Sequence, residues 1–189
     1  SPTELSPKIN YLGTVELIEA LRPLLTRSSS PRISVTTSAA TLQGNDPQLV
    51  DLLLARDSDA ALARGRELAE QGPEVGYANY SSSKRAMSRW IRRVAPTEAY
   101  AAAGIGINGV GPGQVRTGMT KDLFATEQGR ALARGAMPAP YNGIAGAEDI
   151  GAVHAFLVSA QNARMTGQVL FVDGGFDALK RGDDIWESV

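Results

Sequence analysis

Tyr80 and Lys84, in the stretch GYANYSSSKRAMSRWIRR of residues 76–93, are the residues whose types and spacing point to chemistry. In a helix, two residues four positions apart share one face and lie roughly 6 Å apart along the axis. A tyrosine hydroxyl has an ordinary pKa of about 10, and an ammonium beside it favours the phenolate. The pair predicts an acid or base for proton transfer to or from an oxygen. The same spacing also occurs by chance on helix surfaces, and the pair alone leaves both interpretations open.

The pattern around this pair predicts a helix from about Gly76 to Ala95. Three small residues, Ser81 to Ser83, leave the surroundings of Tyr80 uncrowded, and an apolar stripe at helical spacing follows, formed by Met87, Trp90, Ile91 and Val94. Pro96 removes a backbone donor and interrupts the helix, with a short continuation to about Ala103. The first turn, which carries Tyr80, would then lie at an end that a ligand can reach.

Composition limits the classes of function. The 189 residues are 43% hydrophobic and 21% charged, which is ordinary for one globular domain. With 19 basic and 20 acidic residues, the net charge of −1 gives no attraction to nucleic acid or to an anionic membrane surface. The sequence has no cysteine and one histidine, His154, for which no partner is in view and a structural or solvated role is expected, with no metal site. No signal peptide or membrane-length apolar run is recognisable, so we expect a cytoplasmic protein.

Strands and helices alternate along the chain. A β-branched run predicts a strand over Arg32–Thr37, and two more are predicted over Ile105–Val110 and residues 168–172. Helices are predicted from Ser6 to about Thr26, which contains Asn10, and from about Glu148 to Ser159, with short lid-like helices over residues 119–136. Two further helices fill residues 42–75, the first started by Asp46 and Pro47 and the second capped by Ser58. This order predicts an α/β fold with a parallel sheet.

Polar and glycine-rich segments follow two of the strands. Ser38 falls just past the first, where parallel sheets gather ligands, and could donate to a substrate oxygen. The second strand runs into GPGQVRTGM, in which Pro112 and Gly113 stop the strand and allow close approach to a flat ligand. Val115 and Thr117 offer backbone groups and a hydroxyl there. A simple turn is the alternative interpretation of this loop.

Five segments occur in the order found in one family. They are NYLGT at Asn10, ISVTTS ending at Ser38, YSSSK at residues 80–84, INGVGPGQVRT at residues 107–117 and TGQVLFVDGG at residues 166–175. With these segments, the chain resembles the carboxyl-terminal two thirds of a short-chain dehydrogenase/reductase. The resemblance implies a Rossmann-like, doubly wound parallel sheet, represented by its carboxyl-terminal part in one partial domain, 1–189.

The resemblance also implies an activity, an NAD(P)-dependent interconversion of a secondary alcohol and a ketone with NAD or NADP as cofactor. Tyr80 would exchange a proton with the substrate oxygen, Lys84 would lower the pKa of that tyrosine and hold the nicotinamide ribose, and Ser38 would bond the substrate oxygen. Asn10 would anchor a water that links Lys84 to solvent. The loop with Pro112, Gly113, Val115 and Thr117 would meet the nicotinamide end of the cofactor.

Two features depart from the family pattern. The glycine-rich turn that holds the cofactor pyrophosphate is absent before Asn10, so we expect a fragment whose strand RISVTT lies on an open edge. The second is the insertion at 42–75, similar to the branch of bacterial 3-alpha-hydroxysteroid dehydrogenase/carbonyl reductases. Its helices would lie near the substrate mouth, favouring a bulky apolar substrate, or cover the face through which relatives form homo-oligomers. A non-catalytic binding or regulatory protein, and a half-protein completed by another chain, remain as alternatives.

Overall fold

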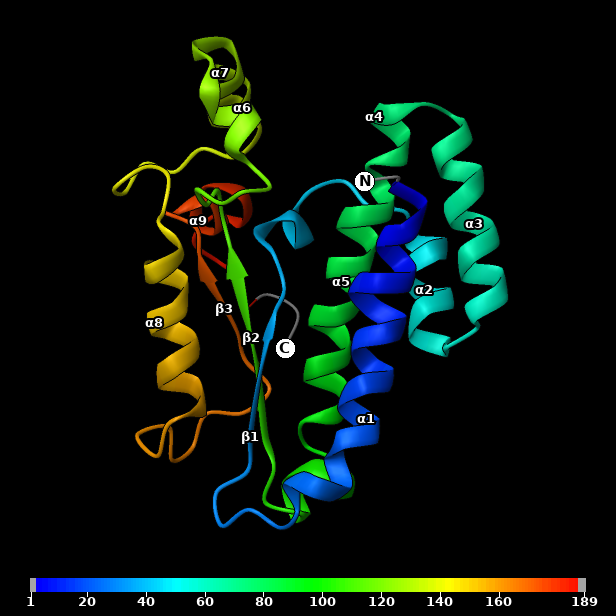
Figure 1. Ribbon diagram of the computed structural model, residues 1–189, viewed down its shortest axis with the longest axis vertical. Coiled ribbons are helices and arrows are strands. Elements are labelled where there is room, and N and C mark those ends of the chain that lie inside the picture. The colour runs from blue at the N-terminus through cyan, green and yellow to red at the C-terminus, as the bar shows by residue number, and fades with distance from the viewer. Residues whose placement is uncertain (1–2, 187–189) are drawn as a thin grey trace.

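The computed structural model describes residues 3–186 and contains a three-stranded parallel sheet in the order β1-β2-β3. The strands are β1 (Arg32–Thr36), β2 (Gly106–Pro112) and β3 (Val169–Val172). Figure 1 shows α8 (Ala147–Val158) on one side of the sheet, and α1 (Thr14–Leu25) and α5 (Ala78–Val94) on the other. This arrangement confirms the predicted doubly wound α/β fold, and β1 lies at an edge of the sheet as expected.

The central strand β2 is crowded on the face toward α5, to which Gly109 and Gly111 both point. A Cβ atom on Gly109 would lie 3.0 Å from the Cδ1 atom of Ile91, and one on Gly111 would lie 2.6 Å from the Phe171 ring. The strand continues two residues past its predicted end at Val110, because the next amide, Gly113 N–H, still donates to the Val172 carbonyl over 2.9 Å. Glycine therefore lets helix α5 and strand β3 approach β2 closely.

The amino-terminal helix is not the single α-helix predicted from Ser6. A short 3₁₀ turn (Thr3–Leu5) is followed by a π-helix (Pro7–Gly13) and only then by α1. Ser6 already has helical backbone angles and makes no side-chain cap. The hydroxyl of Thr14 donates to the carbonyl of Ile9 over 3.2 Å and so gives a partner to a carbonyl of the wider π turns. Asn10 lies in the middle of this π segment.

The insertion is part of the core. After the 3₁₀ turn η3 (Ala39–Leu42) come α2 (Pro47–Ala55), α3 (Ser58–Glu70) and the short α4 (Pro73–Gly76). Five of its side chains are buried in the cluster that also holds Met87 and Ile91 of α5: Leu49, Val50, Leu53, Ala61 and Leu68. The helices of the insertion thus pack against α5. This packing agrees with the expectation that they cover a helix face more than with the expectation that they line the substrate mouth.

Caps define the ends of the inserted helices. Asp46 caps α2 by accepting from Leu49 N over 2.7 Å, as the sequence predicts. The cap of α3 is Asp57, which accepts from Ala60 N over 3.1 Å, and the predicted cap Ser58 is the first helical residue. The guanidinium of Arg64 also bonds to the Asp46 carboxylate, at 2.8 Å, and this interaction lowers the pKa of Asp46.

All but the last of the remaining helices lie close to their predicted positions. Past Pro96, a π segment (Glu98–Ala102) precedes β2, and the lid region forms α6 (Lys121–Ala125) and α7 (Glu127–Ala136). Figure 1 shows α6 and α7 above the carboxyl ends of the strands, away from the rest of the molecule. A last helix, α9 (Phe176–Arg181), follows β3 and buries Phe176. Within residues 3–186 no helix is both long and apolar enough to cross a membrane.

His154 has a structural role, as expected, and two partners that the sequence did not reveal. Its Nδ1 atom lies 2.7 Å from Ser34 Oγ and its Nε2 atom 3.1 Å from Thr36 Oγ1. Both hydroxyls belong to β1, so the imidazole joins α8 to the edge strand. Burial lowers the pKa of His154.

Candidate active site

Tyr80 and Lys84 lie on one face of α5 and contact each other, as their spacing predicts. The Lys84 ammonium nitrogen is 5.8 Å from the centre of the Tyr80 ring. The same nitrogen donates to the Thr36 carbonyl at the end of β1 over 3.1 Å. Both side chains are half-buried. Burial disfavours the charged ammonium and therefore lowers the pKa of Lys84.

Ser38 lies in the segment that packs against this face. It follows β1 with an extended backbone, and its side chain is 7% exposed. The hydroxyl oxygen accepts from Ala40 N over 3.1 Å, so its own hydrogen is available to donate to another group. The next residues, Ala39 and Ala40, are buried in the cluster against which the Tyr80 ring packs. The structure thus places the Ser38 segment beside Tyr80 and Lys84.

The three serines between Tyr80 and Lys84 are fully buried, and each has a different partner. Ser81 donates to the Gly44 carbonyl over 2.5 Å, and Ser82 accepts from Asp46 N over 2.9 Å. Ser83 donates to the Tyr80 carbonyl over 2.7 Å. The first two hold the loop that enters the insertion, and the third holds the turn that carries the tyrosine.

Asn10 reaches this turn from the π-helix. Its Nδ2 atom donates to Ser83 Oγ over 3.1 Å, and Ser83 in turn donates to the Tyr80 carbonyl. A π segment shifts the residues around it relative to α-helical spacing and is frequent at functional sites. The resemblance implied that Asn10 holds a water beside Lys84; the structure shows its amide nitrogen on Ser83, which leaves the amide oxygen for that role.

The loop after β2 occupies the same edge of the sheet. Gly113 has no room for a side chain, because a Cβ atom would lie 2.7 Å from Asp173 Cα. The close approach that the sequence suggested is therefore made to the backbone after β3. The Val115 carbonyl accepts from Thr120 Oγ1 over 2.6 Å, and the Thr117 amide donates to the same hydroxyl over 3.0 Å.

This loop is linked to the tyrosine face only indirectly. Pro112 is the last residue of β2, and Thr117 is exposed. Across residues 3–186, no hydrogen bond joins the predicted loop residues to Tyr80 or Lys84. The structure thus brings together four of the predicted site residues: Asn10, Ser38, Tyr80 and Lys84. The other four lie in the neighbouring loop after β2: Pro112, Gly113, Val115 and Thr117.

Two residues beside the candidate site were not singled out from the sequence. The Tyr77 hydroxyl donates to Gln43 Oε1 over 2.9 Å, and Gln43 Nε2 donates to the Ala136 carbonyl at the end of α7 over 3.1 Å. The Tyr77 ring lies 5.8 Å from the Tyr80 ring. These bonds connect the lid to the first turn of α5. Tyr77 lies one helical turn before Tyr80, and this spacing is the feature of the sequence that could have indicated that Tyr77 lies beside the candidate site.

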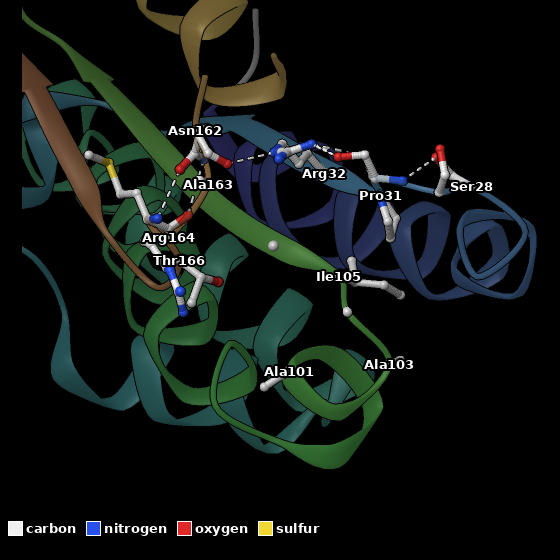
Figure 2. Close-up of a pocket in the computed structure, with 15 residues that line it drawn as sticks. Ser28, Pro31, Arg32, Ala101, Ala103, Ile105, Asn162, Ala163, Arg164 and Thr166 are labelled. Carbon is white, nitrogen blue, oxygen red and sulfur yellow. Dashed lines mark hydrogen bonds between the residues drawn. The ribbon is translucent and has the colours of Figure 1, made fainter. Parts of the chain in front are cut away.

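A cavity of about 570 Å³ lies far from these residues, at the amino-terminal ends of the strands. Its lining comes from residues 28–32, 101, 103–106 and 162–166, at the starts of β1 and β2 and before β3. Figure 2 shows Arg32 in its wall, donating to the Asn162 carbonyl over 2.9 Å. Because ligands of parallel sheets gather at the opposite edge, this cavity is not the candidate active site.

The chain matches a protein-family model over residues 66–177, described as Enoyl-(Acyl carrier protein) reductase. It is 30% identical over 176 residues to the 3-alpha-hydroxysteroid dehydrogenase/carbonyl reductase of Comamonas testosteroni, across 92% of this chain and 66% of that protein. It is 32% identical over 126 residues to 3beta-hydroxysteroid dehydrogenase 1 of Eggerthella lenta, across 67% of this chain and 47% of that protein. The chain belongs to the short-chain dehydrogenase/reductase family, and it spans less than two thirds of the length of each of these relatives.

Solved structures agree with this assignment. The crystal structure of 3-alpha-hydroxysteroid dehydrogenase from Pseudomonas sp. B-0831, complexed with NADH, superposes with a TM-score of 0.83 at 30% identity. It covers 98% of this chain, which covers 70% of that one. A 7 alpha-hydroxysteroid dehydrogenase complexed with NADH and 7-oxo glycochenodeoxycholic acid has a TM-score of 0.65 at 21% identity, covering 89% of this chain and 53% of its own, and shows the likeness of fold.

The described residues fit one end of a nicotinamide dinucleotide. Lys84 uses one of three ammonium hydrogens on the Thr36 carbonyl, which leaves two for ribose hydroxyls. The loop from Pro112 to Thr117 lies on the adjacent strand end, where a flat ring could rest against backbone. Among the described strands, β3 is followed by a glycine turn that opens the short helix α9, but the Asp173 carboxylate already accepts from the Gly175 and Asp177 amides that a pyrophosphate would need. The residues present therefore fit the nicotinamide half of the cofactor.

Proposed function

We propose that this chain carries the catalytic part of an NAD(P)-dependent oxidoreductase that interconverts a secondary alcohol and a ketone. The observation that carries the proposal is the contact of the Lys84 ammonium with the Tyr80 ring, 5.8 Å from its centre, beside the Ser38 segment. Membership of the family supports it, and so does the NADH in the Pseudomonas structure. NAD or NADP would supply or accept the hydride.

In ketone reduction, Ser38 would donate its hydroxyl hydrogen to the substrate oxygen and hold it near Tyr80. The Tyr80 hydroxyl would give its proton to that oxygen as the carbonyl carbon is reduced. Lys84 would stabilise the resulting phenolate, since opposite charges attract strongly at a half-buried site. Alcohol oxidation would run the same proton transfer in reverse.

Asn10 would act on the proton path to solvent. Its amide nitrogen is engaged by Ser83 over 3.1 Å, so its amide oxygen would hold a water near Lys84. Through Ser83 it also fixes the Tyr80 carbonyl. Asn10 would therefore be a positioning residue in this reaction.

The substrate is proposed to be a hydroxysteroid or another bulky apolar carbonyl compound. The Comamonas relative is named for such substrates. Tyr80 packs against an apolar cluster at the site, formed by Ala39, Ala40, Met137 and Phe176 with Leu42 and Phe171 beside it. An apolar substrate would bury additional surface against these side chains.

Assembly into a homo-oligomer is part of the proposal. The outer side of the amino-terminal helices exposes Ile9, Leu17, Leu21 and Leu24, which are 45–62% exposed. Burying such a stripe against a second copy would be favourable. Analytical ultracentrifugation of the chain and of Leu17→Glu tests this, because the buried charge should dissociate the assembly. The same mass for the two proteins would contradict it.

The activity itself is tested by turnover of androstanedione with NADH or NADPH and by calorimetric titration of each nucleotide. Saturable nucleotide binding and turnover support the enzyme. Tyr80→Phe should lower turnover at least about a hundredfold, the usual contribution of a general acid. Tyr141→Phe removes an exposed hydroxyl from a ring that is 74% exposed and should leave turnover unchanged. Equal turnover by Tyr80→Phe and the original chain would exclude the proposed role.

A further inference from the structure

A second cavity at the carboxyl edge of the sheet has a strongly basic lining. It measures about 450 Å³ and lies between the loop after β2 and helix α7. Three arginines line it, Arg116, Arg130 and Arg134, and its lining contains no acidic residue. The remaining wall is largely apolar, with Met137, Pro138 and Ile144 among its members. A cavity with one apolar side and three guanidinium groups suits an apolar ligand that carries an anionic end.

The positive charge is only partly compensated. Glu127, outside the lining, pairs with Arg130 at 3.0 Å and with Arg134 at 2.6 Å. In the part of the chain that the structure describes, it is the one carboxylate that forms ion pairs with these three arginines. The two guanidinium groups hold the pKa of Glu127 below its ordinary value, so it stays charged. Two positive charges therefore remain for a ligand.

The arginine cavity adjoins the tyrosine face. Gln114, which lines the cavity, donates to the Met137 carbonyl over 3.0 Å. Met137 lines the cavity as well, and it is buried in the cluster against which Tyr80 packs. A ligand whose carbonyl meets Tyr80 and whose body passes Met137 would bring its far end to the arginines.

We propose that Arg116, Arg130 and Arg134 form an anion subsite that selects ketones carrying a carboxylate at the end remote from the reacting carbonyl. This inference rests on the proposed function, since it assigns the reacting carbonyl to Tyr80. Arg–carboxylate pairs form paired, directional hydrogen bonds, which fix the orientation of a bound acid. The gain in affinity is moderate, because the cavity is open to solvent and salt.

The test compares dehydrolithocholic acid, a steroid with a ring ketone and a side-chain carboxylate, with its uncharged carboxamide. Calorimetry with the chain should show that the acid binds about tenfold more tightly than the amide, and this difference in affinity should disappear at high salt. Arg116→Gln and Arg134→Gln should each reduce the affinity for the acid about fivefold and leave that for the amide within about twofold. Glu127→Gln should strengthen acid binding, because it removes the competing carboxylate. The matched control is Arg27→Gln, which replaces an exposed arginine before β1 and should change neither the affinity for the acid nor that for the amide.

Three results would overturn the subsite: no saturable binding of the acid, equal affinities for acid and amide, or equal losses for both in the arginine variants. A loss of NADH affinity in Arg116→Gln without a loss of acid affinity would assign the arginines to a dinucleotide phosphate and also overturn it. Failure of the proposed function looks different, since Tyr80→Phe would then leave turnover unchanged while the preference for the acid remained.

Discussion

Asn10 Nδ2 donates to Ser83 Oγ over 3.1 Å, and this bond joins two segments that are 73 residues apart in the chain. Ser83 passes the connection to the Tyr80 carbonyl over 2.7 Å. The π-helix at the start of the chain thereby supports the helical turn that presents the phenol. The position of Tyr80 depends on this long-range contact as well as on its own helix.

Removing either partner of this bond should loosen the turn. Asn10→Ala and Ser83→Ala should each lower the free energy of unfolding by about 1 kcal/mol, since a part-buried hydrogen bond is lost. In a double-mutant cycle the two losses should couple by roughly 0.5–1.5 kcal/mol. Urea unfolding of the four proteins measures this coupling. Ser159→Ala, at the exposed end of α8, is the control, and strictly additive losses would contradict the linkage.

Lys84 should lower the stability of the fold at neutral pH while it supports the activity. Burial lowers the pKa of Lys84 below its unfolded value of about 10.5. Between the two pKa values the unfolded chain binds more protons, so the free energy of unfolding rises with pH across that interval. Lys84→Met should abolish this rise, stabilise the chain at neutral pH and lower turnover at least about tenfold. Urea titrations from neutral to alkaline pH check the first two effects, and a persisting rise in the variant would exclude Lys84 as its source.

Gly113 should tolerate no side chain. In Gly113→Ala the new Cβ atom would lie 2.7 Å from Asp173 Cα, so the backbone of one segment must move. Such overpacking costs about 1–3 kcal/mol of folding free energy. Gly118, in the same loop, has open space at its Cβ position, and Gly118→Ala should be nearly neutral. Thermal unfolding of both variants distinguishes a crowding effect from a general sensitivity of the loop; equal transitions would refute the crowding.

Asp46 should contribute to acid stability. The hydrogen bond from Arg64 lowers the pKa of Asp46 below its ordinary value of 3.8. Its contribution is therefore fully present above that unfolded value and is lost as the pH falls through the folded one. Asp46→Asn keeps an oxygen to cap α2 but removes the charge, so its stability should fall less steeply in acid. Acid unfolding followed by circular dichroism measures the slope, with Asp51→Asn, whose carboxylate is 72% exposed, as the control.

The sequence predicted the parts of this molecule that depend on local spacing. Tyr80 and Lys84 share a face because four residues make about one helical turn, and the three strands follow from short β-branched runs. The site segments around Ser38 and Gly113 were found because the ends of parallel strands meet at one edge. These inferences require no knowledge of which distant residues touch.

Long-range contacts were beyond the sequence. Nothing in the spacing indicates that Asn10 bonds to Ser83, or that His154 bonds to two hydroxyls of β1. The π-helix before α1 was missed because Ser6 and Pro7 are also a common start of an α-helix. The space that Gly113 leaves is occupied by Asp173, which only the packing of neighbouring strands reveals.

The three buried serines of α5 determine how the phenol is aimed. Consecutive helical residues point about 100° apart, and Ser81, Ser82 and Ser83 each meet a partner outside the helix, at Gly44, Asp46 and Asn10. Hydrogen bonds are directional, whereas apolar contacts allow a helix to roll slightly. Helix α5 is thus fixed in its rotation about its own axis as well as in its position. The direction of the Tyr80 hydroxyl is therefore set by buried serines that need never contact a ligand.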